Sequence, residues 1–313
     1  DTVKIDTPVY LEANFTIDDL ALKSVRKHIY SGKKSSIVLE GDAYKLNNRD
    51  KSVGGQLAID IERTLNYELD ESALDKVPSL YTGHNGRRYL GNDETVRINT
   101  TGSAGQSYGA FNIVGMHMHH EGTCNDGVGK GLSGGTISVK VPENDGVSSD
   151  HQNTLIGNFA LFGAVGGMTF INGEAGDRFA VRNSGAMAVV EGLGDFGCEY
   201  MINGSVLNIG SYGKGLANGM SGGYAYQYDP ENLIDNLHDA SSVRYGRISD
   251  DNDDAKSHEL FIQSMLEQHI NATQSEKAKM LLDNWSEERH HFVYLQPIAV
   301  EKTQSATHLQ SLG

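Results

Sequence analysis

The residues best suited to bind a metal form a short histidine run, His117, His119 and His120. On a β-strand, His117 and His119 point to the same face, where both imidazoles can reach one metal ion. The sequence offers no identifiable third ligand, and two histidines without a nearby carboxylate motif are more often surface residues. The run therefore leaves a metal- or ligand-binding module open as a less favoured alternative.

Two further features are weak signals for catalysis or cofactor binding. Residues 192–197 read GLGDFG, but a phosphate-binding loop of this pattern needs a strand before it and a helix after it. Here the segment continues into another short apolar run. Cys124 and Cys198 form no CxxC pair, and two thiols are too few to hold an iron–sulfur cluster. We expect no catalytic residue, metal or cofactor in this chain.

Charge and composition limit the partners. The 313 residues include 26 basic and 41 acidic side chains, a net charge of −15. Nucleic-acid binding needs clustered Lys and Arg, so a nucleic-acid partner is not expected. The longest uncharged stretch, residues 152–173, is interrupted by Asn, Thr and Gly and does not suit a membrane span. The low cysteine content fits a reducing compartment, and we expect a soluble cytoplasmic protein.

The elements that position these residues follow from a repeat in the middle of the chain. Residues 101–223 hold 28 of the 37 glycines. Short apolar runs open at Gly167, Ala186, Gly204 and Gly223, at successive separations of 19, 18 and 19. Aligning the runs gives columns of like positions: Met168/Met187/Ser205/Tyr224, Thr169/Ala188/Val206/Ala225, Phe170/Val189/Leu207/Tyr226 and Ile171/Val190/Asn208/Gln227. Residues 135–141 fit the same frame, followed by an inserted loop over 142–153.

A fixed period of this length, with glycine between β-prone runs, is typical of a parallel β-helix. Glycine suits the corners, because tight bends need positive φ or close backbone approach. The crossover rule for parallel strands predicts a right-handed coil. A β-sandwich is less favoured, since its strands do not keep so regular a register. The predicted fold class is therefore mainly β, a right-handed parallel β-helix with flanking N- and C-terminal α-helices.

The sequence divides into three parts. We expect a mixed α/β segment over 1–95, the glycine-rich β-helix over 96–229, and an acidic linker with C-terminal helices and an extended tail over 230–313. Apolar spacing predicts helices over 16–30, 53–68, 256–270 and 274–285, and a loop over 70–95. The acidic run 250–254 suits a solvated helix N-terminus better than a calcium site, because it lacks the EF-hand glycine and final glutamate.

In the column Phe170/Val189/Leu207/Tyr226, apolar residues stand beside apolar neighbours along each strand. Both faces of that wall must therefore be covered. Either a terminal helix of this chain or another domain lies across it, and the residues do not separate these alternatives. If a partner docks there, the column itself provides the interface candidates Phe170, Val189, Leu207 and Tyr226. Three charged residues of the strongest motif pair either within the coil or across the interface, and the sequence does not separate these alternatives: Arg178, Arg182 and Glu191.

Several segments resemble the C-terminal GXGXG domain of the glutamate synthase large subunit. They are GSAGQSYGAF (102–111), VGKGLSGG (128–135), IGNFALFGAVGG (156–167), GEAGDRFAVRNSGAMAVVEGLGDFGCEYM (173–201) and GMSGGYAY (219–226). The resemblance runs from about residue 95 to 228, with weaker likenesses over 47–58 and 278–285. It implies a right-handed β-helix without catalytic residues, packed against a glutamine amidotransferase domain and a synthase domain that carries FMN and an iron–sulfur cluster.

The resemblance implies a non-catalytic structural component of a glutamate synthase-type complex, in glutamate biosynthesis and ammonia assimilation. The sequence departs from the family's usual residues at Gly127, at Phe196 and in the His117–His120 run. Because of these departures, a second alternative stays open. In it, the chain is a scaffold subunit of an N-methylglutamate synthase-like or formylmethanofuran dehydrogenase-like complex. A free-standing interaction protein is the remaining alternative.

Overall fold

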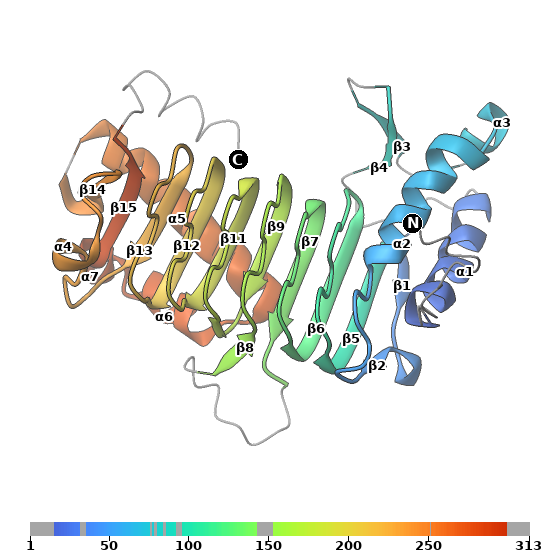
Figure 1. Ribbon diagram of the computed structural model, residues 1–313, viewed down its shortest axis with the longest axis horizontal. Helices are drawn as coiled ribbons and strands as arrows, with labels where there is room; N and C mark the ends of the chain where they lie inside the picture. The colour runs from blue at the N-terminus through green and yellow to red at the C-terminus, as the bar shows by residue number, and fades with distance from the viewer. Residues whose placement is uncertain are drawn as a thin grey trace, which may run out of the picture.

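A long parallel β-solenoid forms the body of the molecule in the computed structural model (Figure 1). The structure describes residues 16–31, 36–75, 77, 80–83, 86–91, 96–142, 153–250 and 252–298. The stacked strands follow the chain order β5, β6, β7, β9, β11, β12 and β13, each parallel to the next. The prediction of a mainly β fold, a parallel β-helix with flanking helices, is confirmed.

The stacked strands make one wall of the coil, called the strand wall here. Its members are β5 (Val96–Ala104), β6 (Met116–Cys124), β7 (Ser133–Lys140), β9 (Gly166–Ile171), β11 (Ser184–Gly192), β12 (Asn203–Ser211) and β13 (Tyr224–Tyr228). The predicted columns pair as aligned, for example Met168 with Met187 and Ser205 with Tyr224. Residues 135–141 also pair in the predicted frame, while most of the inserted loop lies outside the described residues.

Glycine serves the coil by close backbone approach as well as by positive φ. At Gly204 the backbone φ is +90°, whereas at Gly210 a Cβ would overlap the carbonyl oxygen of Glu191. Gly204 has a backbone conformation that other residues rarely adopt, and Gly210 has no space for a Cβ atom. The small residues that revealed the repeat are therefore required by the stacking of its turns.

A second wall, called the turn wall here, joins successive strands without forming strands itself. In each turn, three alternate residues have positive φ, and the described residues contain six such triplets: Ser107/Gly109/Phe111, Gly127/Gly129/Gly131, Phe159/Leu161/Gly163, Arg178/Ala180/Arg182, Phe196/Cys198/Tyr200 and Gly215/Ala217/Gly219. In the first five triplets, the outer members donate backbone N–H bonds to the next turn, as Arg178 does to Asp195 and Arg182 to Glu199. The middle members from Gly129 onward bond to the preceding turn. The turns are thus joined on both walls by backbone hydrogen bonds.

The N-terminal elements pack at the β5 end of the coil (Figure 1). In order they are α1 (Thr16–Ser31), β1 (Ile37–Leu39), η1 (Asp42–Tyr44), β2 (Lys45–Leu46), α2 (Gly55–Arg63), η2 (Thr64–Glu68), α3 (Glu71–Leu74), β3 (Leu80–Thr82) and β4 (Arg88–Leu90). The buried Asp18 carboxylate accepts the backbone N–H groups of Gly54 and Leu57, which ties α1 to the start of α2. The predicted loop over 70–95 is wrong in part, because α3 and the β3–β4 hairpin lie there.

The C-terminal elements close the other end and cover one side. They are α4 (Ile234–Leu237), β14 (Val243–Arg247), η3 (Ile248–Asp250), α5 (Asp253–Thr273), α6 (Glu276–Asp283), α7 (Trp285–Glu288), η4 (Arg289–His291) and β15 (Phe292–Pro297). Two short strands, β8 (Thr154–Ile156) and β10 (Glu174–Ala175), pair at a corner of the coil. β15, in the expected extended tail, pairs antiparallel with β13, and β14, which precedes α5, adds to the sheet by pairing with β15.

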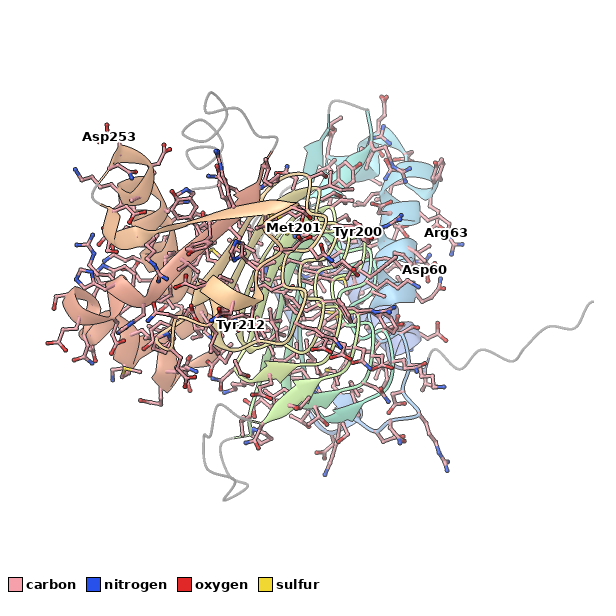
Figure 2. All side chains as sticks on the ribbon, turned by 60° about the vertical axis from the view of Figure 1, so that its left-hand side comes forward. Asp60, Arg63, Tyr200, Met201, Tyr212 and Asp253 are labelled. Atoms are coloured by element: carbon pink, nitrogen blue, oxygen red, sulfur yellow. The ribbon has the colours of Figure 1, made fainter. Side chains whose placement is uncertain are left out.

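Helix α5 runs behind the strands in Figure 1, from β13 towards β7. It begins three residues earlier than predicted, because Asn252 caps it by accepting the N–H of Ala255 and the two following aspartates form its first turn. Leu260 lies on the solvent side of this helix and is 69% exposed. Figure 2 shows α5, which carries Asp253, on one side of the coil and α2, which carries Asp60 and Arg63, on the other. No helix in the described parts of the chain is both long and apolar enough to cross a membrane.

The core lies inside the coil, between the two walls. Inward-facing residues of the strand wall meet the middle members of the turn-wall triplets there, including Leu161, Ala180 and Cys198, each fully buried. A separate apolar cluster lies outside the strand wall, between it and α5 and α6. The coil from β5 to β13 coincides closely with the expected 96–229 segment, and the division into three domains stays a prediction.

Candidate functional site

The outward face of the strand wall has two chemically different halves. Strand pairing places one column across all seven strands: Asn99, His119, Ser138, Phe170, Val189, Leu207 and Tyr226. Its first three members, on β5, β6 and β7, belong to the polar half, and the last four, on β9 to β13, belong to the apolar half. The two halves are the first candidates for a site, since they concentrate most of the predicted site residues.

The apolar half is buried beneath α5 and α6 of this same chain. Phe170, Val189, Leu207 and Tyr226 are each at most 3% exposed, and they share a cluster with apolar residues of both helices. The structure therefore agrees with the first alternative from the sequence, in which a helix of this chain covers the column. A contact of these four residues with another domain stays a prediction.

Aromatic contacts seat the first turns of α5 on this half. The Tyr226 hydroxyl lies 2.8 Å from His258 Nδ1, and the His258 ring stacks on Tyr294 with ring centroids 4.0 Å apart. His258 is 1% exposed, and burial lowers the pKa of its imidazole to about 4. The ring is therefore neutral at physiological pH and acts here as a buried aromatic side chain.

Glu191, for which the sequence left pairing within the coil or across an interface open, holds a buried polar cluster inside the chain. Its Oε1 accepts hydrogen bonds from His269 Nε2 at 2.9 Å, Ser275 Oγ at 2.6 Å and Asn172 Nδ2 at 2.8 Å. Burial raises the pKa of Glu191, but the bond and charge of His269, with the bonds from Ser275 and Asn172, outweigh it and leave the pKa below its usual value. The carboxylate fastens the C-terminal end of α5 and the start of α6 to β11.

The polar half carries a cleft of about 610 Å³ that α5 does not fill. Strands β5 to β7, residues 40–45 and the C-terminal end of α5 line it. Its charges are of both signs, and Lys140 Nζ lies 3.0 Å from Glu121 Oε1. Asn99 Nδ2 likewise donates to Glu40 Oε2 at 2.7 Å. This half is thus polar and partly open to solvent, with no apolar anchor.

The histidine run divides between the two sides of β6. His119 lies on the outer face, where its Nδ1 pairs with Ser138 Oγ, and His117 precedes it on that face at 9% exposure. His120 points into the coil, with Nδ1 2.9 Å from Thr100 Oγ1 and Nε2 3.1 Å from the carbonyl oxygens of Gly102 and Thr123. Burial lowers the pKa of His120. The described residues contain no group of three or more His, Cys, Asp or Glu side chains that could hold a metal ion.

The two thiols and the GLGDFG segment do not fit a cofactor. Cys124 and Cys198 are buried, and burial raises the pKa of both, that of Cys198 to about 12. Protonated, separately buried thiols do not suit an iron–sulfur cluster. Residues 192–197 pass into the turn wall and then β12, so no helix N-terminus faces them as a phosphate cradle would require.

Arg178 and Arg182 lie on the outer face of the turn wall, where both side chains are exposed. They line a second cavity, of about 420 Å³, together with Phe159, Phe162 and Tyr200. The two arginines were among the residues predicted from the sequence, whereas the aromatic residues were not. The sequence does contain a signal for this wall, because Phe159, Arg178 and Phe196 recur at separations of 19 and 18, as the strand columns do.

A family model described as "GXGXG motif" matches residues 83–298. The NADPH glutamate synthase large chain of Bacillus subtilis is 40% identical over 247 residues, 77% of this chain. A ferredoxin-dependent glutamate synthase of Antithamnion is 41% identical over 71% of the chain, and the NADH glutamate synthase of Schizosaccharomyces pombe 42% identical over 65%.

The matched region is a small part of each relative. It covers 16% of the Bacillus subtilis protein, 14% of the Antithamnion protein and 9% of the Schizosaccharomyces pombe protein. Most of each relative's length therefore has no counterpart in these 313 residues.

Proposed function

The chain belongs to the GXGXG-motif family, and from this premise we propose that it is a non-catalytic scaffold domain or subunit of a glutamate synthase-type enzyme. The observation that carries the proposal is the match at about 40% identity to several glutamate synthases, each of which is much longer. The coil then supplies a rigid surface on which catalytic domains are positioned. We include a cytoplasmic location in this proposal.

The buried chemistry of the described residues supports a structural role. The carboxylate of Glu191 binds partners within the chain, and the thiol of Cys198 is protonated and buried in the core. Groups fixed in this way stabilise the fold rather than meet a substrate. The amidotransferase and the FMN and iron–sulfur chemistry that the family resemblance implies would then reside in other domains of the same enzyme.

Reconstitution tests the proposal. The chain is purified alone and together with the amidotransferase and synthase polypeptides of its source, and glutamine hydrolysis, FMN content and glutamine-dependent glutamate formation are measured. We expect neither FMN nor glutamine turnover in the chain alone. In the assembly, we expect omission of the chain to uncouple glutamine hydrolysis from glutamate formation.

Two results would contradict the scaffold role. One is stoichiometric FMN or glutaminase activity in the isolated chain, which would make it catalytic. The other is failure of the chain to assemble with these polypeptides, which would leave no enzyme for it to support.

A further inference from the structure

The turn wall presents a cavity of unusual composition for this molecule. The cavity of about 420 Å³ is lined by the aromatic rings of Phe159, Phe162 and Tyr200 and by the cationic groups of Lys130, Arg178 and Arg182. Glu199 is the one acidic residue in the lining. The chain as a whole has 41 acidic and 26 basic residues, so this lining reverses the overall charge balance.

The cations of this cavity have no side-chain partner among the described residues. Within the described parts of the structure, the side chains of Lys130, Arg178 and Arg182 make no ion pair and no hydrogen bond. By contrast, Lys214 on the same wall pairs with Asp195, and Lys140 on the strand wall pairs with Glu121. The three groups around the cavity therefore remain available for carboxylates from outside the chain.

The backbone does not require side chains at these positions. Arg178 and Arg182 have φ of 61° and 54°, a region in which a residue other than glycine costs about 1 kcal/mol. Glycine occupies equivalent positions in other turns, as Gly131 and Gly163 show. Both arginine side chains are exposed, so the conformation is held by backbone hydrogen bonds between the turns and not by packing of these side chains. Strained residues with unused side chains point to a role outside the fold.

Exposed apolar groups continue from the cavity along the wall. Tyr200 is 53% exposed, Phe162 41%, Val165 58% and Ile202 54%. Tyrosine, phenylalanine and arginine are the residue types that concentrate at the centres of protein interfaces. The strand wall differs, since its apolar half is already covered by α5 and its open half is polar. Of the two walls, the turn wall is thus the one with an apolar and cationic surface left uncovered by the described residues.

We propose that this part of the turn wall, made by Lys130 and residues 159–165, 178–182 and 199–202, docks an acidic face of another domain of the glutamate synthase-type enzyme. Carboxylates of that domain pair with the guanidinium groups of Arg178 and Arg182, and one apolar side chain enters the cavity beside Tyr200. The occupant is assigned by charge complementarity and by length, since the matched region covers only 16% of the Bacillus subtilis relative and less of the other two. The inference rests on the proposed function, because that function supplies the docking domain.

Binding measurements on the reconstituted assembly test the inference. The dissociation constant between the chain and the catalytic polypeptides is measured by titration calorimetry for the unaltered chain, R178E/R182E and Arg182→Gly. Lys279→Glu, on the exposed face of α6, is the matched charge-reversal control. We expect the double reversal to weaken binding at least 100-fold and the glycine variant about 10-fold. We expect the control to bind as the unaltered chain does. Added salt should weaken only the part of the binding that depends on the two arginines.

Arg182→Gly also separates docking from folding. Glycine relieves the positive φ, so the melting temperature of the free chain is expected to stay level or rise while affinity falls. A fall in both would show that Arg182 serves the coil and would overturn the inference. This variant decides the question if the double reversal does not fold.

The remaining outcomes are also decisive. Unchanged affinity in both arginine variants, with normal assembly of the unaltered chain, overturns this docking surface and leaves the scaffold role standing. Failure of the unaltered chain to assemble removes the proposed function and the inference together. Light scattering of the free chain tests whether a second copy binds this surface. Self-association that R178E/R182E abolishes would assign the surface to a second copy and overturn the inference.

Discussion

Each half of the strand wall carries a glutamate near the end of a strand, with opposite consequences. Glu121 on β6 pairs in register with Lys140 on β7, and Glu191 on β11 follows Val190, which pairs with Ile171 on β9. Glu121 is 42% exposed and pairs with Lys140, whereas Glu191 is fully buried and binds His269 and Ser275. Neighbouring columns decide the difference, because apolar side chains on β9 to β13 recruit α5 and polar ones on β5 to β7 do not.

Leu207→Glu gives the largest expected effect on this comparison. Leu207 is 1% exposed beneath α5 and α6, so the new carboxylate would be buried without a partner. We expect a loss of about 5 kcal/mol in the free energy of unfolding, or no folded protein. Urea denaturation followed by circular dichroism measures it.

Thr101→Glu is the matched control on the polar half. Thr101 is exposed at the outer face of β5, and the same substitution there should change stability by no more than about 0.5 kcal/mol. A stable Leu207→Glu chain with unchanged unfolding energy would contradict the intramolecular cover and return the column to a docking role.

Glu191→Ala tests the buried cluster with the next largest effect. It leaves His269, Ser275 and Asn172 without their common acceptor, and removing one partner of a buried pair costs about 3 kcal/mol. Because the folded pKa of Glu191 is lowered, its contribution is present above the unfolded value near 4.5 and is lost as pH falls through the folded value. Denaturation at pH 7, with His269→Ala and the double variant, measures the coupling. Additive losses would mean that the two residues do not act as a pair.

His258 predicts a pH dependence at the opposite end of α5. Its folded pKa of about 4 lies below the ordinary value of 6.5, so the folded state resists protonation. Stability is then complete above pH 6.5, and about 2 kcal/mol is lost on going from pH 6.5 to 4.5. His258→Phe keeps an aromatic ring without a titratable group, and the difference between the two pH profiles isolates the histidine. Parallel profiles would exclude this role.

The strand wall could be predicted from the sequence because stacking imposes a local rule. Small residues at separations of 19, 18 and 19 fixed which residues pair, and Met168, Met187, Ser205 and Tyr224 lie in register as aligned. The apolar column also indicated that a cover exists. What the period cannot specify is the partner of each outward side chain, since that partner belongs to a different element.

The elements that were missed depend on distant or unfamiliar geometry. Glu191 meets His269, 78 residues away, and no periodic signal links two residues so far apart. The strand β15 forms by pairing with β13, which supplies a template that its own sequence does not reveal. In the turn wall, positive φ at Arg178 and Phe196 is imposed by hydrogen bonds between turns, whereas residue preferences alone disfavour it.

Glu121→Gln gives the smallest expected effect and sharpens the comparison most directly. Its contact with Lys140 is 3.0 Å long, but the carboxylate is 42% exposed, so water replaces much of what the pair provides. We expect a loss of about 0.5 kcal/mol at low salt, falling towards zero in concentrated salt as screening removes the attraction. Denaturation in the two salt concentrations measures it. A salt-independent loss of about 3 kcal/mol, the size expected for a broken buried pair, would show that Glu121 is as constrained as Glu191. Cover by α5 would then no longer explain the difference between the two halves of the strand wall.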